Sequence, residues 1–371
     1  MQSKIVDSFA AAVADIPDGA SIFLSGFTEP GTPHNLLRAI YEQGARDLTI
    51  IANSTGGAVI PERVTLATLL AERRVRKVML AFTAGTHPSR PSALEILHNA
   101  GEIEAEIMAQ GTLAERMRAA GAGIPAFYTP AAVGTELAEG REHRVFNGRT
   151  YLLEEALTAD YAFIRAYQAD EFGNLRYRLA QRNFGPLMAA AARCTIIEAE
   201  EVVPVGSFEP DTVHTPGLFV HRVVPIREGD ILRVPKPQAE FISQRSEVGA
   251  DGEEKPRLTR DLMAARIAAE FQHGWMANLG VGMPTMCSDF IPPERDIILH
   301  SENGVIGYGR LASEDEEPPF AVNAGGQSVV LEPLASIVHH ADSFGIVRKG
   351  MLDVAVLGAY EVGANGDLAN W

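Results

Sequence analysis

The sequence predicts an α/β protein built from two related open sheets whose strands run mostly parallel. Three observations support this fold class. Short apolar runs alternate with helical segments and glycine-containing turns, which is the rhythm of βαβ units. The same order of segments recurs in the second half of the chain. With 371 residues the chain is also too long for one ordinary core, so two domains are expected.

The first half opens with four elements. Residues 5–15 have the pattern of an amphipathic helix, and a strand is predicted over 21–24. A helix follows over 35–43, with Gly44 as its C-cap. The next buried strand is predicted over 47–52.

The second half repeats this order. A helix over 262–272 leads into a strand that ends in a glycine- and proline-containing turn. Residues 296–302 then lie over residues 47–53, so that Glu302 corresponds to Asn53. The chain is therefore interpreted as two copies of one α/β unit.

A third match has no gaps. Residues 160–167 align with 353–360, and the register continues until Gly173 meets Gly366. A polar segment, 243–257, has the composition of a solvated linker between the two copies.

The two copies differ in length. After Tyr177 the first copy continues through predicted strands at 194–198 and 220–224, whereas the second copy stops at Trp371. We therefore expect the second unit to be incomplete at its C-terminus. Either the chain is a fragment or a further chain supplies the remainder.

The composition is that of a globular protein with an acidic balance. Hydrophobic residues make up 46% and charged residues 22%, and the formal net charge is -16. This charge argues against nucleic acid or an anionic membrane as the main partner. No apolar run reaches the length that spans a bilayer, and the amino-terminal residues lack an apolar signal core. These features predict a cytoplasmic protein.

The cysteines and histidines show no metal-ligand spacing. Cys194 and Cys287 lie in no CxxC or Cys/His pattern, so both are expected to be buried, inert thiols. His339 and His340 lack a third ligand, and adjacent histidines in a strand face opposite sides. No metal is predicted.

The stretch 297–309 holds the best candidate for a functional carboxylate. A short apolar run, typical of a buried strand, ends just before Glu302, and Gly304 and Gly307 follow. Open α/β sheets bind ligands beyond the carboxyl ends of their strands, and glycines let the backbone approach a bound molecule. The alternative is a solvated glutamate where an ordinary strand enters a loop.

A series of short motifs gives the chain a family resemblance. They lie at 110–118, 121–129, 146–148, 153–155, 169–174, 180–184, 278–284, 301–304, 323–325 and 366–371. With these motifs the chain resembles the family I coenzyme A transferases of the succinyl-CoA:3-oxoacid type, with alpha and beta subunits fused. The resemblance implies the CoA-transferase (NagB/RpiA-like) fold. It also implies an alpha-subunit-like domain over 1–242 and a beta-subunit-like domain over 258–371.

By this resemblance Glu302 is the catalytic nucleophile, and coenzyme A is a substrate that forms a glutamyl-CoA thioester in a ping-pong reaction, with no permanently bound cofactor. Asn53 and Asn278 resemble amides that orient the glutamate and bind acyl oxygens. Gln110 resembles a glutamine that contacts the substrate carboxylate. The alternatives are that Asn53 caps the turn after its strand and that Gln110 is a loop residue without a ligand.

The same resemblance places coenzyme A beside Asn303, Gly304, Gly325 and Gly326. In some members a lysine follows the Asn-Ala-Gly motif, whereas Gly326 stands here. This departure argues against recognition of coenzyme A by charge at that position.

Several reactions fit the resemblance. The first hypothesis is transfer of CoA from a succinyl-CoA-like donor to an acetoacetate-like 3-oxoacid, with 3-oxoadipate or acetate/butyrate-type acceptors as close competitors. An acyl-CoA hydrolase and a non-catalytic ligand-binding remnant are the alternatives. The family's glycine-rich oxyanion segment would follow Trp371, and loss of one such donor typically lowers a rate about 10²–10³-fold. A homodimer of fused chains is expected.

Overall fold

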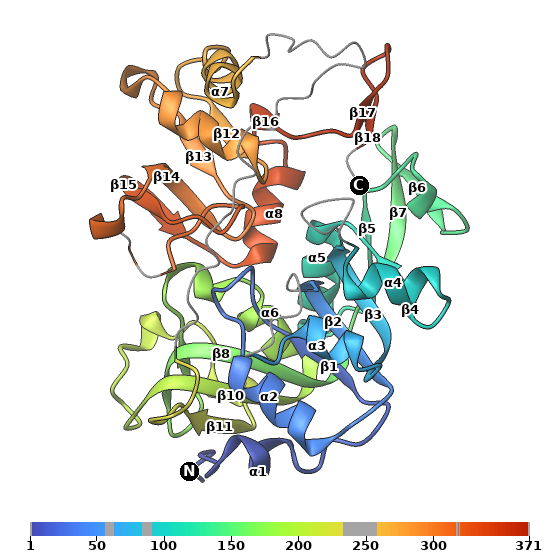
Figure 1. Ribbon diagram of the computed structural model, residues 1–371, viewed down its shortest axis with the longest axis vertical. Coiled ribbons are helices and arrows are strands. Elements are labelled where there is room, and N and C mark those ends of the chain that lie inside the picture. The colour runs from blue at the N-terminus through green and yellow to red at the C-terminus, as the bar shows by residue number, and fades with distance from the viewer. Residues whose placement is uncertain are drawn as a thin grey trace, which may run out of the picture. The chain divides into compact units, whose positions relative to one another are not determined.

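The computed structural model describes residues 2–55, 63–83, 91–232, 258–316, 318 and 320–369 (Figure 1). The predicted linker, 243–257, lies outside the described residues. The chain forms two compact units. The first comprises Met1–Leu232, Glu302–Val305 and Ile337–Lys349, and the second comprises Arg233–Ser301, Ile306–Ser336 and Gly350–Trp371.

The first unit is built on one large sheet. Its strands are β1 (Ser21–Leu24), β2 (Leu48–Ser54), β3 (Val75–Phe82), β4 (Glu104–Ile107), β8 (Ala159–Asp170), β9 (Leu175–Arg176), β10 (Ala192–Val203) and β11 (Arg222–Pro225). They lie in the parallel order β11-β10-β8-β1-β2-β3-β4, and β9 adds antiparallel to β8. The strand order reverses between β1 and β8. The carboxyl ends of these strands are therefore where an open α/β sheet binds its ligand.

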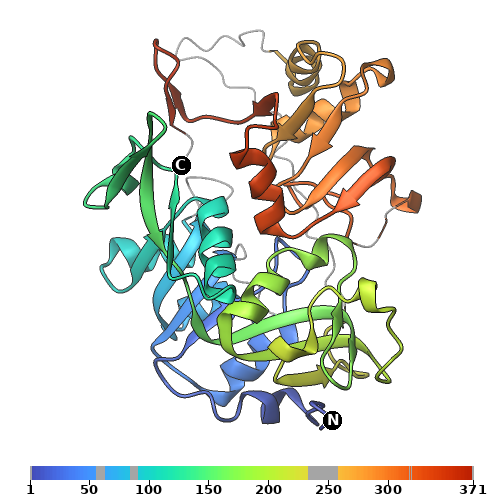
Figure 2. The same cartoon turned by 180° about the vertical axis from the view of Figure 1, so that it is seen from behind.

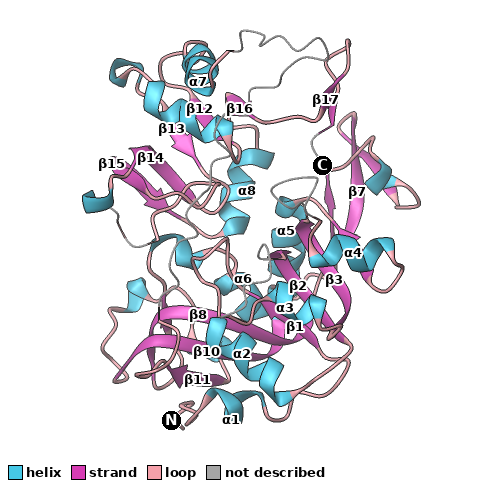
Figure 3. Ribbon diagram, in the orientation of Figure 1, coloured by secondary structure: helices cyan, strands magenta, loops and turns pink. Residues whose placement is uncertain are grey.

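Helices cover both faces of this sheet (Figure 3). They are α1 (Phe9–Val13), α2 (His34–Gln43), α3 (Leu66–Ala71), α4 (Ala93–Asn99), α5 (Gln110–Gly121) and α6 (Gly185–Ala191), and α8 (His340–Arg348) packs against α5. Ile22 and Leu24 of β1 belong to the core cluster that includes α1 to α4, whereas Phe23 belongs to the cluster of α5, α6 and α8. Side chains alternate along a strand, so this division defines three layers. α2 and α3 face the viewer in Figure 1, and α5 and α6 do so from behind in Figure 2.

Smaller elements complete the first unit. An antiparallel sheet has the order β5-β7-β6, formed by β5 (Ala126–Thr129), β6 (His143–Phe146) and β7 (Arg149–Glu155). The short 3-10 helices are η1 (Glu136–Ala138), η2 (Leu179–Arg182), η3 (Pro210–Thr212) and η4 (Gly217–Phe219). Across the described part of the chain, none of the helices has the length and apolar character needed to cross a membrane.

The second unit has a smaller sheet of order β15-β14-β13-β12-β16. Its elements are α7 (Arg260–Ala268), β12 (Met276–Leu279), η5 (Met283–Phe290), η6 (Pro293–Arg295), β13 (Ile298–His300), β14 (Val305–Leu311), η7 (Glu314–Glu316), β15 (Val329–Ile337), β16 (Val354–Val356), β17 (Glu361–Val362) and β18 (Leu368–Ala369). β12 is parallel to both β13 and β16, whereas β13 and β14 are antiparallel.

The internal repeat is confirmed by equivalent hydrogen bonds in the two units. In the first unit, Asp160 Oδ2 accepts the N–H of Ser21 at 3.0 Å. In the second, Asp353 Oδ2 accepts the N–H of Met276 at 2.8 Å. The first bond joins β8 to β1, and the second joins the residue just before β16 to β12. The predicted alignment of 160–167 with 353–360 is therefore structural.

The turns before and after these strands also correspond. Gly19 donates to the carbonyl of Arg46 at 2.9 Å, and Gly274 donates to that of Arg295 at 2.9 Å. Downstream, β8 and β9 form the same antiparallel hairpin as β17 and β18. Its glycine has a φ of 95° in the first unit and 90° in the second, at Gly173 and Gly366 respectively.

Three details differ from the sequence-based expectation. α1 is shorter than residues 5–15, because Ser8 caps it at Phe9 and Ile5 forms a β-bridge with Val223. His339 and His340 do not lie in a strand, since they begin α8.

The third detail concerns the cysteines. Cys287 is buried as expected, whereas Cys194 is only half-buried. Burial raises the pKa of the Cys194 thiol and raises that of Cys287 to about 11. Both cysteines are therefore mainly protonated, unreactive thiols at neutral pH.

Candidate active site

Glu302 lies in a tight turn between β13 and β14. Its neighbours Ser301 and Asn303 are fully buried, whereas Glu302 is half-buried. Asn303 Oδ1 accepts the N–H of Val305 at 3.2 Å, which closes the turn. The turn therefore holds a partly accessible carboxylate at the carboxyl end of β13.

Gly304 allows this turn to approach the backbone of Val338. Its φ is 97°, and a Cβ at this position would lie 2.0 Å from the carbonyl oxygen of Val338. The N–H of Val338 donates to the Gly304 carbonyl at 2.9 Å. Both the dihedral angle and the contact require glycine.

Asn278 holds the end of β13. It is the register partner of His300 in the neighbouring strand β12. Asn278 Nδ2 donates to the carbonyl oxygen of His300 at 3.0 Å and lies 3.2 Å from His300 Nδ1. The amide thus fixes the residue two places before Glu302. Its contact with an acyl oxygen stays a prediction.

Asn53 occupies the corresponding position in the first unit, near the end of β2. Asn53 is 8% exposed, and its side-chain Oδ1 has no hydrogen-bond partner among the described residues. With Glu29, His34 and Arg63 it lines a cavity of about 70 Å³ beyond the carboxyl ends of β1 and β2. A buried amide oxygen without a partner is a place for a water molecule or a ligand. The turn that Asn53 would cap continues into residues 56–62, outside the described part of the chain, so ligand binding by Asn53 stays a prediction.

Asn183 holds the loop after β1. It lies in the motif at 180–184, and the sequence alone predicts no function for it. Asn183 is fully buried, its Oδ1 accepts the N–H of Gly26 at 3.3 Å, and its Nδ2 donates to the Pro30 carbonyl at 2.9 Å. A Cβ on Gly31 would lie 2.7 Å from Asn183 Nδ2. Asn183 therefore shapes the loop at the point where the strand order reverses.

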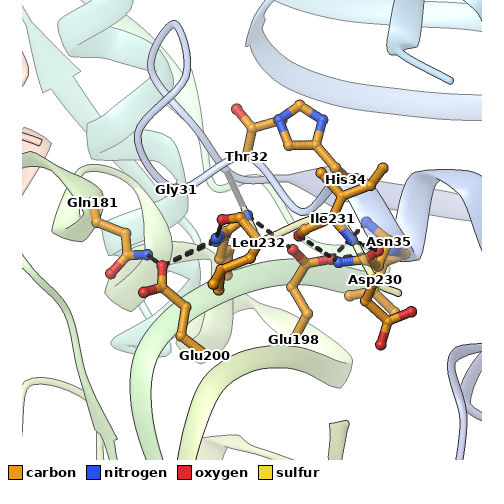
Figure 4. A network of polar contacts seen from close by, with 12 residues as sticks. Gly31, Thr32, His34, Asn35, Gln181, Glu198, Glu200, Asp230, Ile231 and Leu232 are labelled. Carbon is orange, nitrogen blue, oxygen red and sulfur yellow. Dashed lines mark hydrogen bonds and ion pairs between the residues drawn. The ribbon is translucent and has the colours of Figure 1, made fainter. Parts of the chain in front are cut away.

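A buried carboxylate holds the helix that follows this loop (Figure 4). Glu198 of β10 is fully buried, and its Oε2 accepts the N–H groups of Asn35 and Leu36 at 2.9 Å and 3.1 Å. These groups form the first turn of α2, where a carboxylate interacts favourably with the helix dipole. Arg165 lies 3.6 Å from Glu198 and also binds Glu200. Burial raises the pKa of Glu198 to about 7, although Arg165 and the two N–H groups oppose this shift.

Gln110 is the first residue of α5, and its side chain meets α8. Gln110 Nε2 lies 3.0 Å from His340 Nε2. The N-cap of α5 is Ala109, which has no side-chain acceptor. The positive end of the helix dipole at Gln110 therefore favours a nearby anion such as a carboxylate.

Gly325 and Gly326 form a turn organised by Asn323. Asn323 Oδ1 accepts the N–H of Gly325 at 3.0 Å, and the Asn323 carbonyl accepts the N–H of Gly326 at 3.0 Å. These N–H groups are committed within the loop. A contribution of the two glycines to coenzyme A binding would come from their lack of side chains, and it stays a prediction.

Comparison with known proteins identifies the class of enzyme. The family of coenzyme A transferases matches residues 6–225 and 260–371. The chain belongs to the coenzyme A transferase family.

Relatives within the family narrow this assignment. Human succinyl-CoA:3-ketoacid coenzyme A transferase 2 is 38% identical over 389 residues, which cover 100% of this chain and 72% of that protein. One of the subunits of the Pseudomonas putida 3-oxoadipate CoA-transferase is 46% identical over 226 residues, covering 61% of this chain and 95% of its own length. The resemblance to the succinyl-CoA:3-oxoacid type is confirmed, and the chain is a coenzyme A transferase.

Solved structures confirm the predicted fold. The crystal structure of an Escherichia coli acyl-CoA transferase, in a thioester complex with CoA, has a TM-score of 0.75 at 24% identity. It covers 100% of this chain and 71% of the other. Glutaconate coenzyme A-transferase from Acidaminococcus fermentans has a TM-score of 0.53 at 22% identity, covering 60% of this chain and 75% of the other.

The expected cytoplasmic location is wrong on this comparison. The human relative and two mouse relatives, which match 97% or more of this chain, are mitochondrial proteins. The prediction relied on the lack of a membrane-spanning apolar run and of an apolar signal core near the N-terminus. Neither feature defines the compartment, because mitochondrial targeting segments are amphipathic rather than apolar.

Proposed function

We propose that this enzyme transfers coenzyme A from an acyl-CoA of the succinyl-CoA kind to a 3-oxoacid of the acetoacetate kind. The human relative, whose name carries this pair of substrate classes, matches the whole chain. The Pseudomonas relative is named for 3-oxoadipate, so a 3-oxoadipate acceptor is the second candidate.

The proposed reaction passes through a covalent intermediate on Glu302. Its carboxylate attacks the thioester carbonyl of the acyl-CoA and expels the CoA thiolate, which leaves a mixed anhydride. The thiolate then attacks the glutamyl carbonyl, releases the donor acid as a carboxylate and leaves a glutamyl-CoA thioester. An acceptor carboxylate reverses the two steps and departs as its own CoA ester. Glu302 is regenerated, and the kinetics are ping-pong.

The rigid turn at Glu302 is the observation that carries this proposal. A carboxylate is a weak nucleophile, so orientation and partial desolvation must lower the barrier. Asn303 and Gly304 fix the turn, and Asn278 fixes the strand end through His300.

The other candidates receive supporting roles. In this scheme the buried Asn53 amide donates from Nδ2 to an acyl oxygen, as an oxyanion-hole group does. Gln110 presents an amide to the substrate carboxylate at the N-terminus of α5. Gly325 and Gly326, which carry no side chains, would let coenzyme A approach the backbone of the turn at Asn323.

The proposed organisation has an alpha-subunit-like domain over 1–242 and a beta-subunit-like domain over 258–371. The family match supports this division because it is interrupted between residues 225 and 260. A homodimer of such fused chains is also proposed, and sedimentation velocity tests it.

A transfer assay with and without an acceptor acid tests the reaction. With succinyl-CoA and acetoacetate we expect acetoacetyl-CoA to accumulate, with parallel double-reciprocal lines. Release of free CoA at the same rate without any acid would identify a hydrolase and overturn the proposal. Repeating the assay with 3-oxoadipate and acetate ranks the acceptors by kcat/KM.

A further inference from the structure

A buried histidine lies against the side chain proposed to bind the substrate acid. His340 is fully buried at the start of α8. Its ring stacks on Phe184 with centroids 3.7 Å apart, and the rings of Phe27 and Phe344 lie 5.6 Å and 6.2 Å away. The backbone N–H of His340 donates to the Asn183 carbonyl at 3.2 Å. The imidazole is therefore held in one position.

The helix that carries His340 is also fixed against α5. Arg348, at the other end of α8, donates to the carbonyl of Gly111 at 3.1 Å. A Cβ on Gly111 would lie 2.7 Å from the ring of Phe344, so glycine permits the close approach of the two helices. His340 and Gln110 consequently face each other from two elements of the same compact unit.

The contact between the two side chains limits the Gln110 amide to two orientations. Its Nε2 lies 3.0 Å from His340 Nε2, and two nitrogens attract at this distance only when one donates and the other accepts. Either the amide Nε2 donates a hydrogen bond to an unprotonated His340 Nε2, or the amide is turned over and its oxygen accepts a hydrogen bond from the His340 Nε2–H group. In the second arrangement both amide N–H groups are available to a carboxylate.

We propose that His340 is a positioning residue, which orients the Gln110 amide for the carboxylate of the acid substrate. This inference rests on the proposed function, in which Gln110 binds that carboxylate. His340 makes no contact with the substrate itself in this scheme. It reduces the freedom that Gln110 loses on binding, so its effect falls on the binding of the acid rather than on attack by Glu302.

Replacing His340 by an aromatic ring without hydrogen-bonding groups tests the proposal. His340→Phe keeps the stacking on Phe184 and removes the bond to Gln110. In discharge of a preformed glutamyl-CoA adduct by acetoacetate, we expect the concentration for half-maximal rate to rise about five- to tenfold. The limiting rate changes less than about twofold. His340→Gln restores a hydrogen-bonding partner and should bring the half-maximal concentration back toward the wild-type value.

A double-mutant cycle separates positioning from general loosening. In a Gln110→Ala background, His340→Phe should have no further effect on acid binding. His214→Phe is the matched control, because His214 also stacks on an aromatic ring, that of Tyr177, and binds a backbone N–H through Nδ1. It should lower the melting temperature without changing the half-maximal acid concentration.

Two results would overturn the proposal. One is a folded His340→Phe variant with an unchanged half-maximal acetoacetate concentration. The other is that His340→Phe raises this concentration just as much in the Gln110→Ala background. A measurement on the unaltered enzyme covers the case in which the variant does not fold. The ring ¹⁵N resonances of His340 should shift on titration with acetoacetate, and they should not shift in Gln110→Ala. Adduct formation on Glu302 is independent of these outcomes, so failure of the proposed function would be recognised separately.

Discussion

The two units present different side chains from one strand arrangement. β1, β2 and β8 in the first unit have the same parallel pairing as β12, β13 and β16 in the second. In this register Asn53 stands where Glu302 stands in the other unit. The first side chain can donate or accept a hydrogen bond, and the second can form an acyl bond. The comparison shows that the scaffold determines where a side chain emerges, whereas the residue type determines the chemistry.

The strands that carry these two residues also end differently. β2 continues through Ser54, whereas β13 stops at His300 and the chain turns back into β14. The residue after Ser54 is Thr55, and its counterpart is Gly304 with a φ of 97°. A glycine at this point allows the turn that exposes Glu302, and a threonine does not favour it.

The largest expected loss of activity is that of Glu302→Gln. This substitution places an amide at the position of Glu302, as Asn53 does in the first unit, and removes the nucleophile. We expect kcat to fall by at least about 10³-fold while the melting temperature stays near that of the wild type, because the side chains are isosteric. Steady-state kinetics and thermal unfolding check both statements. Retention of a tenth of the activity would be incompatible with a nucleophilic Glu302.

Replacing Asn53 is expected to lower kcat less than replacing Glu302. Asn53→Ala should lower kcat about 10²-fold, as for loss of one oxyanion-hole group. Stability should hardly change, since Asn53 Oδ1 has no hydrogen-bond partner among the described residues. Asn35→Ala is the matched control, because this buried amide exchanges two hydrogen bonds with the backbone of Ile231 and should cost about 1–3 kcal/mol in the free energy of unfolding. A large stability loss in Asn53→Ala would indicate a structural role.

The turn itself can be tested through stability. Gly304→Ala should lower the free energy of unfolding by about 2–4 kcal/mol, since a left-handed dihedral angle and a contact with Val338 both oppose a Cβ. Gly350→Ala is the control, with a φ of 78° but open space around a Cβ, and it should cost only about 1 kcal/mol. Urea unfolding compares the two. Equal losses would mean that the contact with Val338 contributes nothing.

The smallest expected effect is on stability, and it comes from replacing Asp160 or Asp353, the two equivalent aspartates of the repeat. Hydrogen bonds from the Ser21 hydroxyl and N–H hold the pKa of Asp160 below its ordinary value of 3.8. Its contribution is therefore present above that pH and is lost as the pH falls through the lower, folded-state pKa. Asp160→Asn should cost about 1 kcal/mol at pH 7, a modest figure because solvent screens this half-exposed group, and the difference from wild type should shrink in acid. Asp353→Asn, which weakens the bond to Met276, should have a similar effect at pH 7. Unfolding curves at several pH values give the comparison.

Much of the scaffold could be predicted because it is encoded locally. The strand at 21–24 and the helix that ends at Gly44 follow from apolar runs and a left-handed C-cap, and the structure has both. The same local signals in the second half revealed the repeat. Glu302 was identifiable because it follows a buried strand and precedes glycines.

The residues that the sequence left without a role act over long separations. Asn183 binds the loop after β1 from 157 residues away, Glu198 caps α2 from 163 residues away, and His340 meets Gln110 from 230 residues away. No periodicity or turn signal specifies such pairs, because they depend on how strands and helices are assembled. For His340 the sequence pattern bears only on metal binding, because its contact with Gln110 depends on the packing of α8 against α5.

Mass spectrometry of the covalent intermediate tests the central claim most directly. The enzyme is incubated with acetoacetyl-CoA without an acceptor acid, digested at low pH and mapped by peptide. We predict that coenzyme A is attached to the peptide containing Glu302, that the adduct disappears on addition of succinate, and that Glu302→Gln forms none. An adduct on any other residue, or one that persists in Glu302→Gln, would contradict the account.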